Sequence, residues 1–284
     1  MCAGALSCRP VPSCFCCCLP NPLSKKEYAV IRSLLWMFCL LFVYPAAAAE
    51  GGDDGIAALR RMAAQGNADA QFMVAERLRQ GVETTKDEAQ GVFWYHMAAE
   101  QNHAAAQSAL AAAYANGAGV TKNEAQAAYW NLKAAEQGDV NAQAALCVAY
   151  AYGRGVAIDY KQAVYWANQG AEQGNGVAQV LLAAAYATGE GVAKDYKQAM
   201  AWYQKAAEQG RAVAQFQLGV GYANGFGVPK DGVKAYAWYA LAASNGYGDA
   251  EASRLRMQQR LNAAQLQAAE ALLSEWKQKY KPRA

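Results

Sequence analysis

The sequence has few of the residues from which metal sites and disulfide frameworks are built. It contains two histidines, and seven of its eight cysteines lie before residue 40. The remainder of the chain therefore has Cys147 alone, which excludes an internal disulfide there. One cysteine and two histidines are also too few for a structural zinc site.

Charge of either sign is also scarce. Charged residues make up 17% of the chain and the formal net charge is +3. The excess lies in the first 49 residues, since basic and acidic residues balance after them, with a mildly basic end over 251–284. Phosphate recognition needs clustered Lys and Arg, so we expect no nucleic-acid partner. The 54% of hydrophobic residues instead predicts a folded chain.

Residues 1–49 have the composition of an export signal. Lys25 and Lys26 precede the apolar stretch 34–43, and alanines 46–49 form a small-residue cleavage site. The stretch is short for a membrane span. We expect cleavage near residue 49, export to the periplasm or outside the cell, and no stable membrane span afterwards. A retained anchor is the alternative.

The cysteine-rich residues 1–22 fit no ordinary signal peptide. A metal-binding tract is one interpretation, because cysteine-rich tracts bind metals. The other is a wrong start assignment, with translation beginning near Leu23. We favour the second, because the chain from Leu23 onward already contains a complete signal.

The rest of the chain is a repeat with a period of 36 residues. Tryptophan, glutamine, tyrosine and glycine each recur at this interval. The tryptophans are Trp94, Trp130, Trp166, Trp202 and Trp238, and the glutamines are Gln71, Gln107, Gln143, Gln179 and Gln215. Such a period predicts a solenoid, in which each unit buries its apolar face against its neighbours.

Each unit predicts two helices. In the unit 178–210, Leu182 and Tyr186 have helical spacing, and the glycines at 189 and 191 end the first helix. Asp195 then begins the second helix, and Gln198 three residues later predicts a capping box.

A glycine ends each second helix, because glycine accepts the left-handed conformation that follows a last helical turn. This residue is Gly210 in the unit described above and Asn102 in the first unit. Asparagine is the commonest substitute for glycine in this conformation, so the exception supports the assignment.

The quoted unit, with the pattern AQ-LG-Y-G-GV-D-A-WY-KAAEQG, resembles the Sel-one-like repeat, a relative of the tetratricopeptide repeat. The resemblance covers residues 56–250. It implies an all-α fold, a right-handed α-solenoid of 36-residue helix-turn-helix repeats. It also implies a protein-interaction scaffold without enzymatic activity or cofactor, of a type that bacteria often export.

One secreted, cysteine-rich branch of this family is associated with penicillin binding and β-lactam hydrolysis. This chain lacks that branch's paired cysteines in each repeat. We therefore do not transfer that activity to this chain. A cell-envelope hydrolase, or a protein that binds peptidoglycan or β-lactams, is kept as the alternative interpretation.

We expect four parts along the chain. They are a signal region over 1–49, an N-terminal half-repeat helix over 50–66, five repeats over 67–250, and C-terminal capping helices with a basic tail over 251–284.

In tetratricopeptide relatives the first helix of each unit lines the concave face, and this geometry selects candidate partner-binding residues. They are Phe72, Glu76, Arg79, Ser108, Asn116, Asn141, Val148, Tyr152, Val180, Thr188, Phe216, Val220 and Asn224. The set is charged in the first unit and nearly uncharged afterwards. We expect it to bind an uncharged or apolar segment of a protein or peptide. Close packing of the alanine-rich face, leaving a narrow groove, is the alternative.

Three other sets of residues could carry chemistry. Ser274 and Lys277 match Ser-x-x-Lys, but the partner motifs of that nucleophile do not occur, so we expect a surface serine. We expect Cys147 to be a small buried residue, because the same position is alanine in three other units.

His96, Glu100 and His103 have the spacing of one helical face and could hold a transition metal. The helix should end at Asn102, however, which would take His103 away from the other two. We therefore expect no metal site here.

Overall fold

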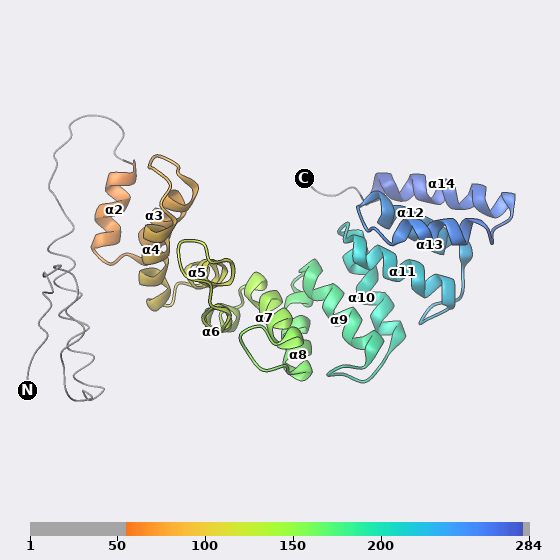
Figure 1. Ribbon diagram of the computed structural model, residues 1–284, viewed down its shortest axis with the longest axis horizontal. Coiled ribbons are helices and arrows are strands. Elements are labelled where there is room, and N and C mark those ends of the chain that lie inside the picture. Colours follow the sequence, from red (N-terminus) through yellow and green to blue (C-terminus); the bar gives the residue numbers. More distant parts are fainter. Residues whose placement is uncertain (1–54, 281–284) are drawn as a thin grey trace, which may run out of the picture. The chain divides into compact units, whose positions relative to one another are not determined.

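The computed structural model describes residues 55–280, which lie in one compact unit. This part of the chain contains thirteen helices and no strand (Figure 1). The helices are α2 (Gly55–Ala64), α3 (Ala68–Gln80), α4 (Glu88–Glu100), α5 (Ala104–Asn116), α6 (Glu124–Glu136), α7 (Val140–Tyr152), α8 (Tyr160–Glu172), α9 (Gly176–Thr188), α10 (Tyr196–Glu208), α11 (Ala212–Asn224), α12 (Gly232–Ser244), α13 (Ala250–Gln258) and α14 (Ala263–Lys279). The predictions for the signal region, the cysteine-rich segment and the last four residues lie outside the described residues.

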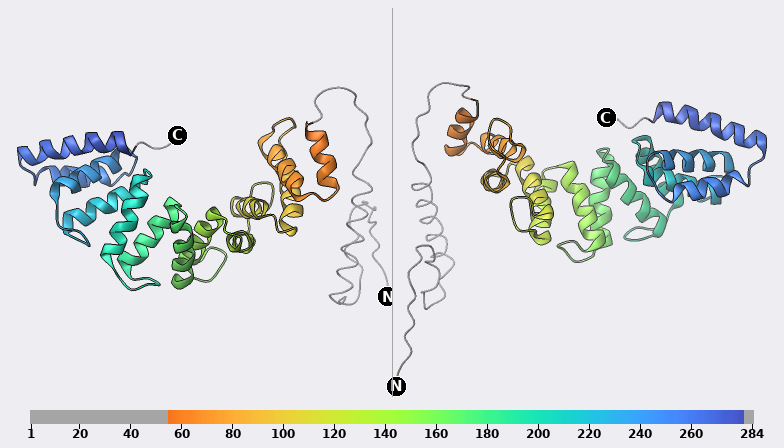
Figure 2. Two further views of the ribbon diagram at one scale, coloured as in Figure 1. Left: turned by 180° about the vertical axis from the view of Figure 1, so that it is seen from behind. Right: turned by 45° about the horizontal axis from the view of Figure 1, so that its top comes forward.

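The helices form five consecutive pairs. We call α3, α5, α7, α9 and α11 the A helices, and α4, α6, α8, α10 and α12 the B helices. Each A helix packs against the B helix that follows it. Each B helix packs against the next A helix, except the last, α12, which packs against α13 and α14. Figures 1 and 2 show this succession from several sides. The predicted all-α solenoid of 36-residue helix-turn-helix repeats is therefore confirmed.

Small side chains allow the helices to approach closely. Each A helix buries at least one large aliphatic residue, such as Leu182 in α9, and surrounds it with buried alanines from both helices. Trp130, Trp166 and Trp238 are buried between repeats, while Trp94 and Trp202 are half-buried against the same clusters. The tryptophans are thus part of the core, as predicted.

At the N-termini of the B helices, one of the two contacts of the predicted capping box is present. The N-cap side chain accepts backbone N–H groups of the first turn. In α10 the Asp195 carboxylate accepts the backbone N–H groups of Lys197 and Gln198, at 2.8 and 3.1 Å. The reciprocal contact from Gln198 is not made, and among the described helices both halves form in α14 alone, between Asn262 and Gln265. The carboxylate already satisfies two donors in α10, so the exposed Gln198 side chain is left to water.

We expect Asp195→Ala to lower the free energy of unfolding by about 1 kcal/mol, because two N–H groups lose their acceptor. Asp195→Asn keeps a side-chain oxygen and should cost much less. Urea unfolding of the two variants beside the parent chain measures the difference. Equal stability of the alanine variant and the parent would show that water replaces the cap.

The ends of the helices also follow the prediction. Gly189 ends α9 at φ 87° and Gly210 follows α10 at φ 80°. Asn102 adopts the same left-handed conformation at φ 67° after α4. The first-unit exception is therefore confirmed as a substitution for glycine.

A second glycine in each A–B loop has a role that its conformation alone does not show. These residues are Gly119, Gly155, Gly191 and Gly227, all with φ between 68 and 74°. A Cβ at any of them would overlap the main chain at the first residue of the preceding repeat's B helix. In the first repeat Glu83 holds this position at φ 57°, facing the shorter helix α2.

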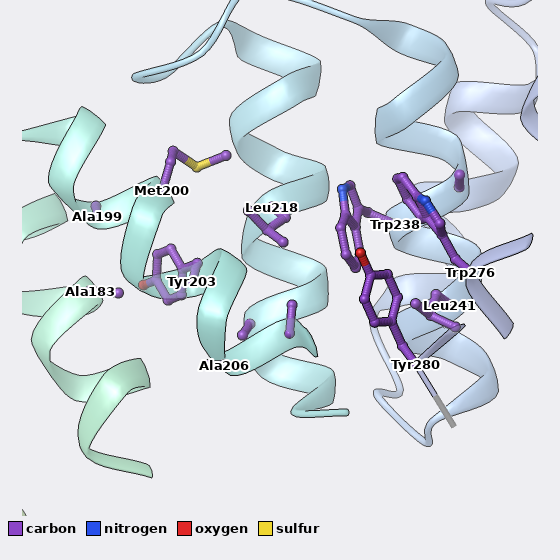
Figure 3. Packing of buried hydrophobic residues seen from close by; sticks show 13 residues of the cluster. Ala183, Ala199, Met200, Tyr203, Ala206, Leu218, Trp238, Leu241, Trp276 and Tyr280 are labelled. Atoms are coloured by element: carbon purple, nitrogen blue, oxygen red, sulfur yellow. The ribbon is translucent and has the colours of Figure 1, made fainter. Parts of the chain in front are cut away.

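The C-terminal end of the solenoid is closed by α13 and α14. Figure 3 shows Trp276 of α14 beside Trp238 of α12, with ring centroids 4.2 Å apart, and Tyr280 next to them. In α13 Arg254 replaces an apolar residue and donates to the Tyr236 hydroxyl and to Glu251. These polar contacts suit a terminal repeat with no further neighbour.

Candidate functional site

The candidate residues of the A helices divide into an exposed and a half-buried set. Six side chains are exposed: Arg79, Asn116, Asn141, Tyr152, Thr188 and Asn224. The other seven are half-buried: Phe72, Glu76, Ser108, Val148, Val180, Phe216 and Val220. The first set is available to a partner as it stands, whereas the second set is partly committed to packing.

The two phenylalanines show this commitment. Phe216 stacks on Tyr247 with ring centroids 4.6 Å apart, and Phe72 stacks on His103 at 5.0 Å. Each ring thus rests on the segment that follows its own helix pair, before α5 for Phe72 and before α13 for Phe216. These residues stabilise the junctions between repeats, and a mutation there would disturb the fold together with any binding surface.

The first repeat has a cluster of polar groups around Glu76. Its carboxylate forms an ion pair with Arg79 at 2.7 Å and accepts hydrogen bonds from Gln80 and from the Tyr95 hydroxyl. Burial opposes ionisation of Glu76, but the bonds from Arg79 and Tyr95 outweigh it and lower its pKa. Burial and the Glu76 contact raise the pKa of Tyr95. The cluster therefore holds a carboxylate beside a phenol that keeps its proton.

Three pockets lie in matching places in the first, third and fifth repeats of the solenoid. Each is formed by an A helix, its B helix and the helix after it, and we name it by its repeat. The repeat-1 groove has a volume of about 340 Å³, the repeat-3 groove about 250 Å³ and the repeat-5 groove about 450 Å³. They adjoin the exposed candidate residues, with Asn116 lining the first groove and Tyr152 the second.

Of the three grooves, the repeat-3 groove is lined by the fewest charged residues, with Glu190 alone. Its wall includes Cys147 of α7, Val164 of α8 and Leu181 of α9, and Tyr152 and Tyr160 line it as well. The repeat-1 groove has charged residues, Arg79 and Glu88, at the places equivalent to Ala151 and Tyr160. The grooves thus share a shape and differ in chemistry.

Cys147 is buried, as predicted, and burial raises the pKa of its thiol to about 12. A thiolate, and not a thiol, attacks disulfides and alkylating agents. We expect iodoacetamide to label Cys147 roughly 10³-fold more slowly in the folded chain than in urea at pH 8, since an unperturbed thiol has a pKa of about 8.5. Mass spectrometry of the peptide containing Cys147 measures this, and fast labelling in the folded state would contradict it.

The residues considered for a metal do not converge. His96 lies 3.5 Å from Glu100, while the Nδ1 atom of His103 accepts the N–H of Ala106 and its Nε2 atom lies 3.1 Å from Asp69. His103 is the N-cap of α5 and so belongs to another helix. Residues 55–280 contain no group of three side chains suited to a metal ion.

Ser274 is exposed on α14, as expected for a surface serine.

No helix within the described part has the length and apolar character needed to cross a bilayer.

Sequence reasoning missed the role of the repeated glutamine. Gln179 is buried, donates to the Ala171 carbonyl at 3.2 Å and accepts from Gln209 at 2.9 Å. The same arrangement occurs around Gln71, Gln107, Gln143 and Gln215. A polar residue at a fixed place among buried alanines was the available signal. It marks the joint between repeats rather than a binding site.

Comparison with known proteins identifies the repeat. The Sel1 repeat model matches residues 68–103, 104–139, 140–175, 176–210 and 212–247. A crystal structure of a protective antigen of uropathogenic Escherichia coli strains, which displays an SLR fold, is similar with a TM-score of 0.73 and 41% identity. That match covers 80% of this chain and 49% of the antigen, so the chain spans about half of the antigen's length.

A second similar structure is a Sel1 repeat protein from Oxalobacter formigenes. It has a TM-score of 0.65 and 31% identity, and the match covers 78% of this chain and 87% of that protein. Comparison with curated proteins finds no match.

Proposed function

Since the chain belongs to the Sel1 repeat family, we propose that it is an exported, non-enzymatic scaffold that binds a protein or peptide through its A helices. The family fold presents a long surface built from equivalent positions, and proteins of this architecture commonly bind other proteins. Export is inferred from the order of charged, apolar and small residues before residue 50.

The observation that supports this function most directly is the series of grooves along the solenoid. They lie in equivalent places in the first, third and fifth repeats, and each combines apolar with charged lining residues. An elongated partner could place one side chain in each groove and hydrogen-bond to exposed amides such as Asn116 and Asn224. The A helices supply the rigid frame, because each is packed between two other helices.

The test is crosslinking in the native cells with the full chain carrying a C-terminal affinity tag. The parent chain should capture a specific protein, and the triple variant Asn116→Ala, Tyr152→Ala, Asn224→Ala should lose most of it. Tyr129→Ala, Tyr165→Ala is the matched control, because both tyrosines are exposed on B helices. Capture that survives the triple variant but not the control would overturn binding through the A helices.

The same experiment separates the alternative from this proposal. Recovery of murein fragments without a specific protein, together with turnover of a chromogenic β-lactam by the purified chain, would support the envelope-hydrolase alternative.

A further inference from the structure

The third repeat differs from all four other repeats at two positions around the start of α8, and from the first two repeats at a third. Ile158 stands where the other four repeats have lysine: Lys86, Lys122, Lys194 and Lys230. Tyr152 stands where they have Gln80, Asn116, Thr188 and Asn224. Tyr160 stands where the first two repeats have Glu88 and Glu124, whereas the fourth has Tyr196 and the fifth has Gly232. The third repeat alone among the five has an apolar or aromatic residue at all three positions.

These three side chains are exposed and lie near one another. Tyr152 is 62% exposed, Ile158 57% and Tyr160 40%. The two tyrosines line the repeat-3 groove, and Ile158 covers Gly153, where a Cβ would come within 3.0 Å of its Cγ1 atom. We call these three residues the repeat-3 rim.

Nothing in the fold requires an apolar rim. The other repeats make the same turn with lysine at this position, and a lone exposed apolar residue is ordinary, but a cluster at the edge of an apolar pocket marks a binding surface. Aromatic residues around a desolvated pocket are also the usual composition of an interaction hot spot.

Charge at the rim indicates what accompanies the apolar group. The Arg154 guanidinium lies 5.8 Å from the centre of the Tyr152 ring. Within the described part of the chain it takes part in no ion pair. Glu190 lines the groove itself and would repel a second carboxylate placed inside it. A ligand carboxylate would therefore be favoured at the rim, beside Arg154, and disfavoured in the groove.

We propose that the repeat-3 groove binds one bulky apolar side chain of a partner peptide, and that Arg154 pairs with an Asp or Glu side chain close to it in the partner's sequence. The volume of about 250 Å³ suits a single large side chain rather than a cofactor. This inference rests on the proposed function and assigns the site and the chemistry of the segment that it recognises.

Selection from a phage-displayed library of random 12-residue peptides tests the recognition, with the purified product of the full chain as bait. The expected result is enrichment of peptides with Leu, Ile, Phe or Trp within two residues of Asp or Glu. The affinity of a synthetic enriched peptide is then measured by fluorescence anisotropy.

The decisive variants replace rim residues by those of other repeats at the same positions. The double variant Ile158→Lys, Tyr160→Glu should keep the fold and lower the affinity for the enriched peptide at least ~10-fold. A loss of this size is typical of removing a binding hot spot. Tyr196→Glu, at the place equivalent to Tyr160 in the fourth repeat, is the matched control and should change affinity by less than about 2-fold. Arg154→Glu should shift the selected neighbour from acidic to basic residues.

The outcomes separate this inference from the proposed function. The enriched peptides could bind the rim variants with unchanged affinity and lose affinity for Asn116→Ala or Asn224→Ala. That result would overturn the repeat-3 site and leave binding through the A helices intact. If the library yields no enriched peptide, the inference is overturned. If crosslinking in cells also captures no specific protein, the proposed function is overturned with it. A dimer in light scattering that Ile158→Lys converts to monomer would show that the rim binds a second copy of the chain instead.

Discussion

Gly155→Ala is expected to lower the free energy of unfolding by about 2–5 kcal/mol. A left-handed conformation costs an alanine roughly 1–2 kcal/mol. The new methyl group would also overlap the main chain of Glu124, the first residue of α6, which belongs to the preceding repeat. Backbone atoms cannot rotate away as a side chain can, so the loop or the helix has to shift, at a cost of about 1–3 kcal/mol more.

Gly138→Ala is the matched control. Gly138 has φ 90°, and a Cβ there would meet no atom within 4 Å. The variant should therefore show the conformational cost alone, about 1–2 kcal/mol. Urea unfolding followed by circular dichroism measures both variants. Equal losses would mean that the close approach at Gly155 carries no energy and that the loop adapts freely.

This pair of glycines shows what could be predicted of the fold. The left-handed conformation after each B helix follows from local rules, and the sequence indicated it even for Asn102, which adopts φ 67°. The role of Gly155 depends on a helix start 31 positions earlier, which no local pattern encodes. The period of 36 residues predicted the pairing of helices because it reflects the stacking itself.

The candidate site was predicted less completely, and the residues show why. The register of the A helices selected Tyr152 and Asn224, which are exposed, but it also selected Phe72 and Phe216, which stack on His103 and Tyr247. The position of a residue within the repeat specifies the helix face from which its side chain projects. It does not specify whether a long ring lies against the next repeat, because that depends on the residues facing it. The grooves were not predicted for the same reason, since each is the space left between three helices.

The second large effect is expected at the repeated glutamine. Gln179→Leu should lower the free energy of unfolding by about 1–3 kcal/mol. The Gln179 amide joins the end of one repeat to the body of the next, by donating to Ala171 and accepting from Gln209. Leucine has a similar volume and makes neither bond. The Ala171 carbonyl still accepts the backbone N–H of Gly174, so the cost is that of two lost hydrogen bonds, each about 0.5–1.5 kcal/mol. Gln198→Leu, at an exposed glutamine of the same repeat, should change stability by less than about 0.5 kcal/mol.

Gln179→Glu separates hydrogen bonding from packing. The glutamate side chain has the shape of glutamine, and the pH controls whether its carboxyl group is protonated. Above a pKa of about 4.3 the unfolded chain ionises this glutamate, while burial without a cation favours the neutral acid in the folded chain. The folded pKa is raised, so the variant is most stable below about pH 4 and loses stability as the pH rises towards the folded pKa. The difference in urea midpoint between parent and Gln179→Glu should therefore shrink from pH 7 to pH 4, where the acid again donates to the Ala171 carbonyl. A difference that does not change with pH would show that the amide contributes shape alone, and that the repeats are held together by their alanine and tryptophan contacts.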